Sequence, residues 1–378
     1  MPFCAQAPPS FGQNSFVETD YGTSNQDKAI LMAVGDIMMH KGNILGGYDP
    51  KTDSYDYTPY FEYVTPIFQK ADWVFGNLET CLAGKDSKLY LGNNKWEKGY
   101  TAWPFFNAPE VLAGNLKDAG FTILSTANNH AMDRGTDGII GTIDTLDKAG
   151  LQHTGTFTSP ENRESVLISK KRGVNMAFFA YTYSTNGIHV PEGKEFMVNR
   201  IEPDLMERDF IRAREAGADC ITCYLHFGRE YSALPSEYQI SAARKILDQG
   251  ADIVLGSHPH VVQPYEIVTS ENESKKVIIY SMGNFLSNMN KGYEDIGVIF
   301  CIGLTPENGC NNYRISDIKT ILTRVYKYYD GGKRTYRIIP IRDMLENRNR
   351  YNVSDTFYYD TEKKLEEMER HLASMLEI

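Results

Sequence analysis

Histidines with the spacing of a metal site stand in the second half of the chain. His258 and His260 flank Pro259, and a lone His226 lies upstream of them. Residues two apart on an extended backbone point the same way, and Pro259 biases His258 away from the helical region. We therefore expect the two imidazoles to point at one place. With a third imidazole on a neighbouring strand they would suit a borderline-soft divalent metal, although a His-Pro-His loop can also arise by chance.

Alternating strands and helices must position these side chains. Strands are predicted at residues 30–34, 72–75, 121–125, 176–181, 219–225 and 252–255. Helices are predicted at 60–70, with an interruption near Pro66, and at 109–119, 136–149, 203–216 and 237–249. Such alternation implies an α/β protein whose sheet is built from crossover units.

A different pattern follows His260. Residues 277–280, residues 297–303 and the two segments that flank Asp330-Gly331-Gly332 are predicted to be consecutive antiparallel strands. Residues 361–376 carry apolar side chains at helical spacing, which predicts a terminal helix packed on the surface. We expect a polar tail at 1–28, one domain at 29–345 and a helical extension at 346–378.

Seven polar residues fall at or just after the carboxyl ends of predicted strands, where ligands bind in open α/β sheets. They are Asp36, Glu79, Asn129, His130, His226, His258 and His260. Each alone could be a turn or exposed residue. Together, two carboxylates, one amide oxygen and three imidazoles could hold one or two divalent ions, with a carboxylate shared between them. His130 would then be free for another role.

Composition narrows the class of protein. The chain of 378 residues has a net charge of −10, which argues against a nucleic-acid partner or an anionic membrane surface. No apolar run approaches the roughly 20 residues that span a bilayer. Cys220 and Cys223 fall within a predicted strand, so buried thiols are expected there rather than a zinc ribbon.

The beginning of the chain has neither a basic segment nor a long apolar one, so no signal peptide is expected as given. A secreted protein whose leader was removed would look the same. The compartment is therefore the cell envelope or the exterior if a leader was removed, and otherwise the cytoplasm.

Ordered motifs carry a family resemblance over about residues 30–300. They are Gly35-Asp36, Gly76-Asn77-Leu78-Glu79, Asn128-Asn129-His130-x-x-Asp133-x-Gly135, His226-Phe227-Gly228-x-Glu230-Tyr231, Gly256-x-His258-Pro259-His260-x-x-Gln263-Pro264 and Tyr280-Ser281-Met282-Gly283-Asn284-Phe285. The chain resembles the CapA-type poly-γ-glutamate capsule-synthesis family, which is similar in fold to the calcineurin-like metallophosphoesterases. The resemblance implies a four-layer α/β/β/α sandwich with a metal site at the sheet edge.

The resemblance also implies roles for single residues. The expected metal ligands are Asp36, Glu79, Asn129, His226, His258 and His260, with Glu79 where the related enzymes place a bridging aspartate. His130 would face the substrate and Asp133 would orient it. Met38 stands where a ligand histidine is usual, and His40 lies nearby. The ion could be Mn, Zn or Fe.

Four residues are weaker candidates for substrate contact. Arg229 and Glu230 follow His226 and could face the substrate or form a surface ion pair. Asn284 and His40 could add polar contacts at the rim. The loop at 184–193 could close over the site as a lid or be an ordinary exposed loop.

Two functions remain open at this point. The first is a metal-dependent hydrolase or transferase, in which an ion activates water and polarises a phosphoryl or acyl oxygen. His130 would then be the general acid or a stabiliser of developing charge. The same groups could assist epimerisation by polarising a peptide carbonyl. The second is a non-catalytic subunit that binds an anionic γ-glutamyl polymer through the metal. A γ-glutamyl or phosphorylated substrate fits either function.

Overall fold

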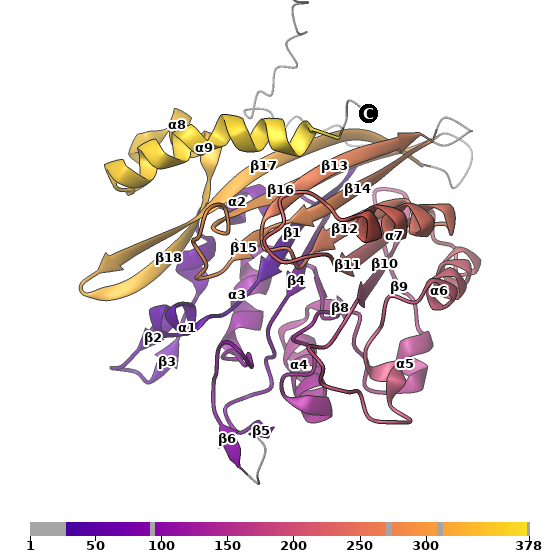
Figure 1. Cartoon of the computed structure of the whole chain (residues 1–378), viewed down its shortest axis with the longest axis horizontal. Coiled ribbons are helices and arrows are strands. Elements are labelled where there is room, and N and C mark those ends of the chain that lie inside the picture. Colours follow the sequence, from indigo (N-terminus) through magenta and orange to yellow (C-terminus); the bar gives the residue numbers. More distant parts are fainter. Residues whose placement is uncertain (1–27, 91–94, 270–273, 308–312, 376–378) are drawn as a thin grey trace, which may run out of the picture.

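The computed structural model describes residues 28–90, 95–269, 274–307 and 313–375. Two β-sheets dominate it (Figure 1). The first sheet runs in the order β18 (Lys333–Pro340), β17 (Tyr313–Asp330), β16 (Ile296–Pro306), β1 (Ala29–Ile37), β4 (Trp73–Leu78), β7 (Ile123–Ser125) and β8 (Gln152–Thr154), and β15 (Asn284–Leu286) also pairs with β1. The second runs β13 (Val262–Thr269), β14 (Lys275–Met282), β12 (Ile253–Ser257), β11 (Cys220–His226), β10 (Val174–Thr182) and β9 (Leu167–Lys171).

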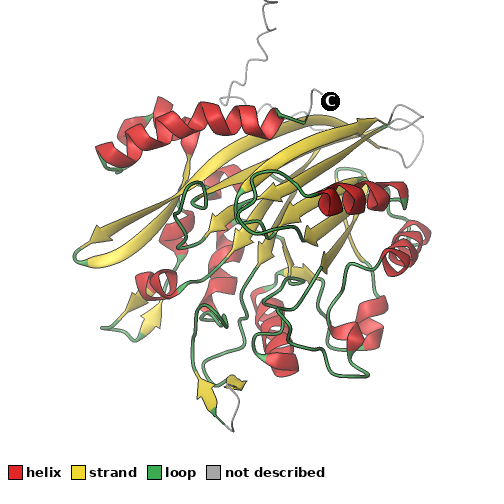
Figure 2. Ribbon diagram, viewed as in Figure 1, coloured by secondary structure: helices red, strands yellow, loops and turns green. Residues whose placement is uncertain are grey.

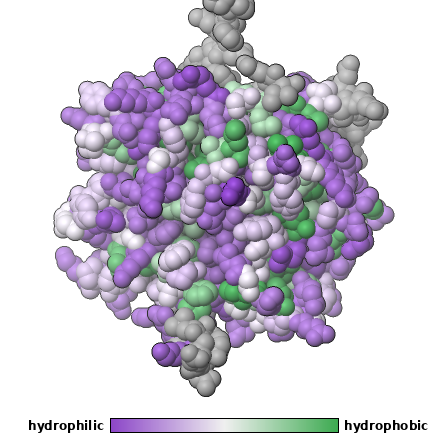
Figure 3. Space-filling model, in the orientation of Figure 1, coloured by the Kyte–Doolittle hydropathy of each residue, from purple (hydrophilic) through white to green (hydrophobic). Residues whose placement is uncertain are grey.

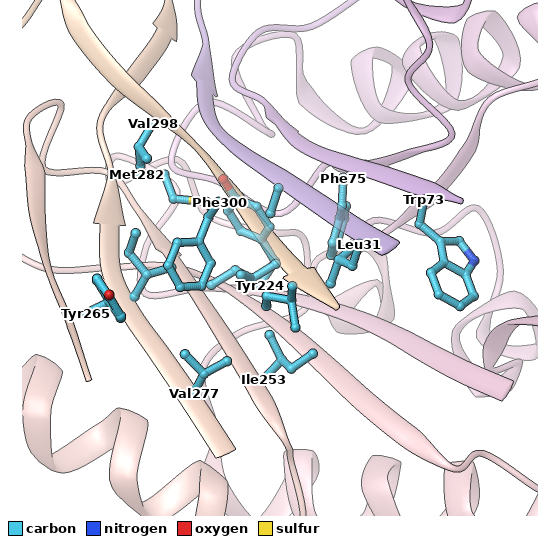
Figure 4. Close-up of a cluster of buried hydrophobic side chains, with 14 of the residues drawn as sticks. Leu31, Trp73, Phe75, Tyr224, Ile253, Tyr265, Val277, Met282, Val298 and Phe300 are labelled. Carbon is cyan, nitrogen blue, oxygen red and sulfur yellow. The ribbon is translucent and has the colours of Figure 1, made fainter. Parts of the chain in front are cut away.

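The two sheets pack face to face through a core of alternating apolar side chains. Figure 4 shows Leu31, Phe75 and Phe300 of the first sheet lying near Tyr224 and Ile253 of the second. All five are buried. Because successive side chains of a strand point to opposite faces, the remaining apolar residues of each sheet face outward and need a second cover.

Helices provide that cover on both outer faces (Figure 2). On the first sheet, α3 (Val111–Ala119) and α4 (Gly135–Ala149) contribute to a core with the outward residues of β1 and β4. On the second, α6 (Pro203–Glu215) and α7 (Glu237–Asp248) pack in the same way. The predicted four-layer α/β/β/α sandwich is therefore confirmed.

Smaller elements complete the described chain. They are α1 (Lys41–Gly47), β2 (Tyr48–Asp49), β3 (Ser54–Tyr55), α2 (Thr65–Phe68), β5 (Lys88–Tyr90), β6 (Trp96–Lys98), α5 (Pro160–Glu164) and α8 (Ile341–Glu346). The side of the molecule in Figure 3 is largely hydrophilic, with hydrophobic side chains in small separate areas. Within the described ranges, no helix has both the length and the apolar character that crossing a bilayer requires.

The terminal helix is α9 (Asp355–Ala373), and Leu365, Met368 and Leu372 on its buried face join the core between the sheets. The surface-packed helix predicted near the C-terminus is thus confirmed, although Leu376 lies outside the described residues. The predicted tail at 1–28 lies outside them too, except for Lys28. The domain boundaries stay a prediction.

Two local predictions were wrong, and a strand was missed. Residues 60–70 form a 3-10 turn at Thr58–Phe61 and the short helix α2 instead of one helix. β14 is parallel to β12 in the second sheet and not part of the antiparallel run in the first. β13, its antiparallel partner, was missed. Strand pattern alone does not reveal which sheet a strand joins, because that choice depends on contacts far along the chain.

Candidate metal centre

Strand register brings the predicted residues to one edge of the sandwich. In the first sheet, Asp36 of β1 pairs with Asn77 of β4 on one side and with Asn284 of β15 on the other. In the second sheet, His226 at the end of β11 pairs with Ser257 at the end of β12. Because parallel strands end at the same edge, the residues that follow them are gathered there as well.

Side chains from the two sheets meet in a buried cluster. His260 Nδ1 lies 3.3 Å from Asp36 Oδ2, and His226 Nδ1 lies 4.0 Å from Asp36 Oδ1. His226 Nε2 lies 3.5 Å from Glu79 Oε1 and 2.9 Å from Asn129 Oδ1. The ring centres of His226 and His258 are 4.8 Å apart. All six expected ligands therefore lie together.

Glu79 occupies the middle of the cluster. It belongs to two groups of three residues, one with His258 and His260 and one with Asp36 and His226, and within each group the ligand atoms lie within 4.8 Å of one another. Glu79 is therefore the residue that the two candidate ligand groups share.

The polar atoms left without partners fit a cation. Among the described residues, three buried atoms have no hydrogen-bond partner: both carboxylate oxygens of Glu79 and Nδ1 of His258. His260 donates its Nδ1–H to Asn284 Oδ1 at 3.1 Å, which leaves Nε2 with its lone pair. Buried polar groups are normally satisfied, so the cluster has the donor set and the open valences that a divalent ion would fill.

The two carboxylates have opposite electrostatic environments. Burial and the neighbouring charge of Asp36 raise the pKa of Glu79 well above its usual range. Burial opposes ionisation of Asp36 as well, but the hydrogen bond and charge of His260 and the hydrogen bond from Asn77 act against it, and the pKa of Asp36 lies below its usual value. A cation at the cluster would offset the cost of ionising the buried Glu79.

The imidazoles are also shifted. Burial and the neighbouring His260 lower the pKa of His258 to about 3, and burial and His258 lower the pKa of His226 well below its usual value. Burial acts in the same direction on His260, but the hydrogen bond to Asp36 outweighs it and raises its pKa. His226 and His258 are thus neutral at neutral pH, as metal ligation requires.

The backbone at the histidine pair differs from the expected extended form. β12 ends at Ser257, and His258 and His260 have φ angles of 98° and 60°. The amide of His258 donates to Asp36 Oδ2 at 3.2 Å, and the carbonyl of Pro259 accepts from the amide of Tyr231 at 2.8 Å. The imidazoles converge because this tight turn is held at both sides, and the extended geometry predicted for them is wrong. Left-handed φ angles in residues other than glycine cluster at functional sites.

A second buried pair lies beside the cluster. His130 Nδ1–H donates to Asp133 Oδ2 at 2.7 Å, and the amide of Phe106 donates to the same oxygen at 2.6 Å. The rings of Phe106 and His130 meet edge to face at 4.7 Å. Burial raises the pKa of Asp133, although His130 opposes the shift. Asp133 therefore has the geometry that orients His130, as the sequence suggested.

The four weaker candidates for substrate contact lie in different places. Asn284 is buried and donates to the carbonyls of His260 and Glu294 at 3.3 and 2.9 Å, so it holds the backbone at His260 in place. His40 packs edge to face on Phe106 at 5.3 Å, and burial lowers its pKa to about 4. Glu230 is exposed, and its charge raises the pKa of Glu79. Arg229 is exposed too, and the structure does not bring it into the cluster.

Sequence reasoning missed three supporting residues. Asn77 donates to Asp36 Oδ1 at 2.8 Å, and Ser257 Oγ lies 3.0 Å from His226 Nδ1. Tyr183 packs its ring 4.8 Å from that of His258. Asn77 and Ser257 lie within the sequence motifs quoted above, in which neighbouring residues were the candidate ligands. Nothing in the sequence distinguished Tyr183.

Comparison with known proteins places this geometry in context. A family model described as "Bacterial capsule synthesis protein PGA_cap" matches residues 30–289. "Capsule biosynthesis protein CapA" of Bacillus anthracis is 30% identical over 265 residues, which cover 69% of this chain and 60% of that protein. "PGA biosynthesis protein CapA" of Bacillus subtilis is 31% identical over 278 residues, which cover 70% and 64%. This chain thus spans less than two thirds of the length of either relative.

One solved structure is also similar. The calcineurin-like phosphoesterase YfkN from Bacillus subtilis aligns with 78% of this chain and 90% of its own, at 14% identity and a TM-score of 0.46.

Proposed function

Because the chain belongs to the bacterial capsule synthesis protein family PGA_cap, we propose that it is a metal-dependent hydrolase or transferase acting on an anionic γ-glutamyl polymer of the cell envelope. The names of two relatives, which refer to capsule and PGA biosynthesis, support the choice of polymer. The observation that carries the chemistry is the buried Glu79 carboxylate, which has no hydrogen-bond partner among the described residues and is common to two ligand triads.

We propose that Asp36, Glu79, Asn129, His226, His258 and His260 hold one or two divalent ions of Mn, Zn or Fe. Such an ion would supply a Lewis acid that polarises a carbonyl or phosphoryl oxygen and makes water a better nucleophile at neutral pH. Asn77, Ser257 and Asn284 would fix the orientation of the ligands through the hydrogen bonds described above.

His130 and Asp133 would carry the proton. Cleavage of an amide requires a proton on the leaving nitrogen as the carbon–nitrogen bond breaks. Asp133 accepts the Nδ1–H of His130, which sets the tautomer and leaves Nε2 to exchange a proton with the substrate. The carboxylate would also stabilise the imidazolium form. Phe106 packs against the imidazole, with the ring centres 4.7 Å apart.

The test joins metal analysis to turnover. Purified protein should contain stoichiometric divalent metal and hydrolyse or transfer a γ-glutamyl oligomer in a mass-spectrometric assay, and a panel of phosphodiesters serves as the comparison. Chelation should abolish turnover and added metal should restore it. Metal-loaded protein that binds the oligomer without turning it over would replace this proposal by a metal-dependent binding subunit. Protein without metal would contradict both.

A further inference from the structure

A cavity of about 680 Å³ is lined in part by the loop that follows β10, and it has no place in the chemistry above. Its lining includes loop residues Ser184, Thr185 and Ile188, together with Asn199 and Arg200. The volume falls within the usual range of small-ligand pockets, about 300–1,000 Å³.

The loop at 184–190 is shared by the cavity and the cluster. On one side it lines the cavity, and on the other Asn186 Oδ1 accepts from Asn129 Nδ2 at 3.2 Å. Asn129 is one of the proposed ligands. A ligand in the cavity would therefore lie one loop away from the metal centre.

Arg200 is held firmly at this boundary. Its backbone forms a bridge with Thr182 at the end of β10, and the amide of Ile201 donates to the carbonyl of Thr182 at 3.0 Å. Its guanidinium donates to the carbonyl of Tyr183, whose ring contacts His258. The position of Arg200 is thus fixed relative to the cluster.

The charge of Arg200 is not neutralised by a carboxylate. Within the described ranges no ion pair forms at Arg200, and its buried Nε has no hydrogen-bond partner. The cavity's other arginine, Arg163, is engaged by Asp209 at 2.6 Å. Glu164 is paired with Arg212, and Glu195 accepts from the amide of Gly193. Glu164, Glu195 and Glu202, the three carboxylates of the lining, are all exposed.

Asn199 adds a hydrogen-bond acceptor to the lining of the cavity. It is 1% exposed, and its Nδ2 donates to the carbonyl of Ala180 at 3.2 Å, which fixes the orientation of the amide. Its Oδ1 is buried without a partner. Arg200, which has no carboxylate partner among the described residues, and Asn199, whose Oδ1 has no hydrogen-bond partner there, both line the cavity, and together they match a ligand that offers a carboxylate and an N–H group.

The geometry points to a subsite in this cavity for one γ-glutamyl unit, with Arg200 binding its α-carboxylate and Asn199 accepting from its amide N–H. The inference rests on the proposed function for the identity of the polymer. Arginine suits the carboxylate because its planar fork donates two parallel hydrogen bonds. A phosphodiester would satisfy Arg200 but would offer no N–H to Asn199.

The test compares two trimers in metal-loaded protein by calorimetry. One is tri-γ-glutamate amidated at its terminus, and the other is the same chain built from 4-aminobutanoate, which lacks the α-carboxylates. Wild-type protein should bind the first at least about 10-fold more tightly, the usual scale of a hydrogen bond to a charged group. Arg200→Gln should lose that discrimination, Arg200→Lys should keep part of it, and Arg208→Gln, the same change at an exposed position of α6, should keep all of it.

Metal content and melting temperature measured on each variant separate recognition from folding. Discrimination that survives in Arg200→Gln, or equal binding of both trimers by wild-type protein, would overturn the inference and leave the metal chemistry in place. Discrimination that depends on Arg200 in a protein without turnover would support the subsite and contradict only the hydrolase.

Discussion

Two buried polar clusters in this molecule follow different rules. Asp209 of α6 is 0% exposed, and its carboxylate accepts from Arg163 at 3.0 and 2.6 Å and from Tyr181 at 2.6 Å. Arg212 donates to it as well. Glu79 is equally buried, yet neither of its oxygens has a hydrogen-bond partner among the described residues.

The difference indicates a separate role for each cluster. A buried carboxylate surrounded by donors fixes α5 and α6 against β10, and its partners compensate the cost of desolvation. A buried carboxylate without donors carries a cost that the fold alone does not offset. Such a group persists where a ligand completes it, and strained or unsatisfied groups gather at functional sites for that reason.

The largest expected effect separates the two clusters by metal content. The double substitution His258→Ala and His260→Ala should remove nearly all bound metal, because it deletes two of the three residues in one ligand triad. Asp209→Asn and Cys220→Ser should retain it. Elemental analysis of dialysed protein is the measurement, and stoichiometric metal in the double variant would disprove the assignment.

The next effect concerns turnover at constant metal content. His130→Asn should keep fold and metal but lower kcat by roughly 10²- to 10⁴-fold, the usual contribution of a general acid or base. Asp133→Asn should give a smaller loss with a changed pH profile, since it acts by orienting His130. Loss of metal in His130→Asn would make His130 a ligand, and full activity would remove it from the mechanism.

A third prediction tests the satisfied cluster. Asp209→Asn should lower the free energy of unfolding by about 3 kcal/mol, because it leaves the buried Arg163 without its counter-charge. The same substitution at Asp147, whose ion pair with His153 leaves its side chain 64% exposed, should cost less than about 1 kcal/mol. Urea unfolding measures both, and equal effects would mean that burial does not distinguish the two sites.

The ligand set followed from the sequence for a physical reason, whereas the four layers were implied by the family resemblance. Runs of apolar residues mark buried strands, and polar residues just after several such runs must meet when parallel strands end at one edge. That logic brought Asp36, Glu79 and His226 together even though it gave the wrong backbone for His258 and His260. What mattered was the number of ligands at strand ends rather than the angle at each one.

Features that depend on contacts between distant segments were not predictable in the same way. Asn77 is recognisable as a support only when Asp36 on the neighbouring strand is seen beside it. Arg200 lies in no recognisable sequence motif. It stands out only because no carboxylate pairs with it among the described residues. The sequence of β13, like that of β14, does not show which sheet the strand joins, and β13 was missed.

The smallest expected effect is a change in stability, and it should have opposite signs at Glu79 and at a buried carboxylate that has hydrogen-bond donors. Burial raises the pKa of Glu79 in the folded, metal-free protein. A raised folded pKa gives stability that is present below the unfolded value, about 4.3, and is lost as pH rises through the folded pKa. Metal-free wild-type protein should lose this contribution toward neutral pH, whereas Glu79→Gln has no proton to lose. The variant should therefore be more stable at neutral pH, by on the order of 1 kcal/mol, and its advantage should shrink toward pH 4.

Glu266→Gln is the matched control, because the buried Glu266 accepts from Tyr280 and, at 2.8 Å, from Arg244. There the same substitution removes a charge that is already compensated, so it should destabilise the protein. Thermal melts from pH 4 to 8 with a chelator present give both comparisons. Added metal should then raise the melting temperature of wild-type protein but not of Glu79→Gln, since the cation would replace the missing donors of the carboxylate. Destabilisation of metal-free protein by Glu79→Gln would mean that this carboxylate has a partner in the fold and would end the contrast between the two clusters.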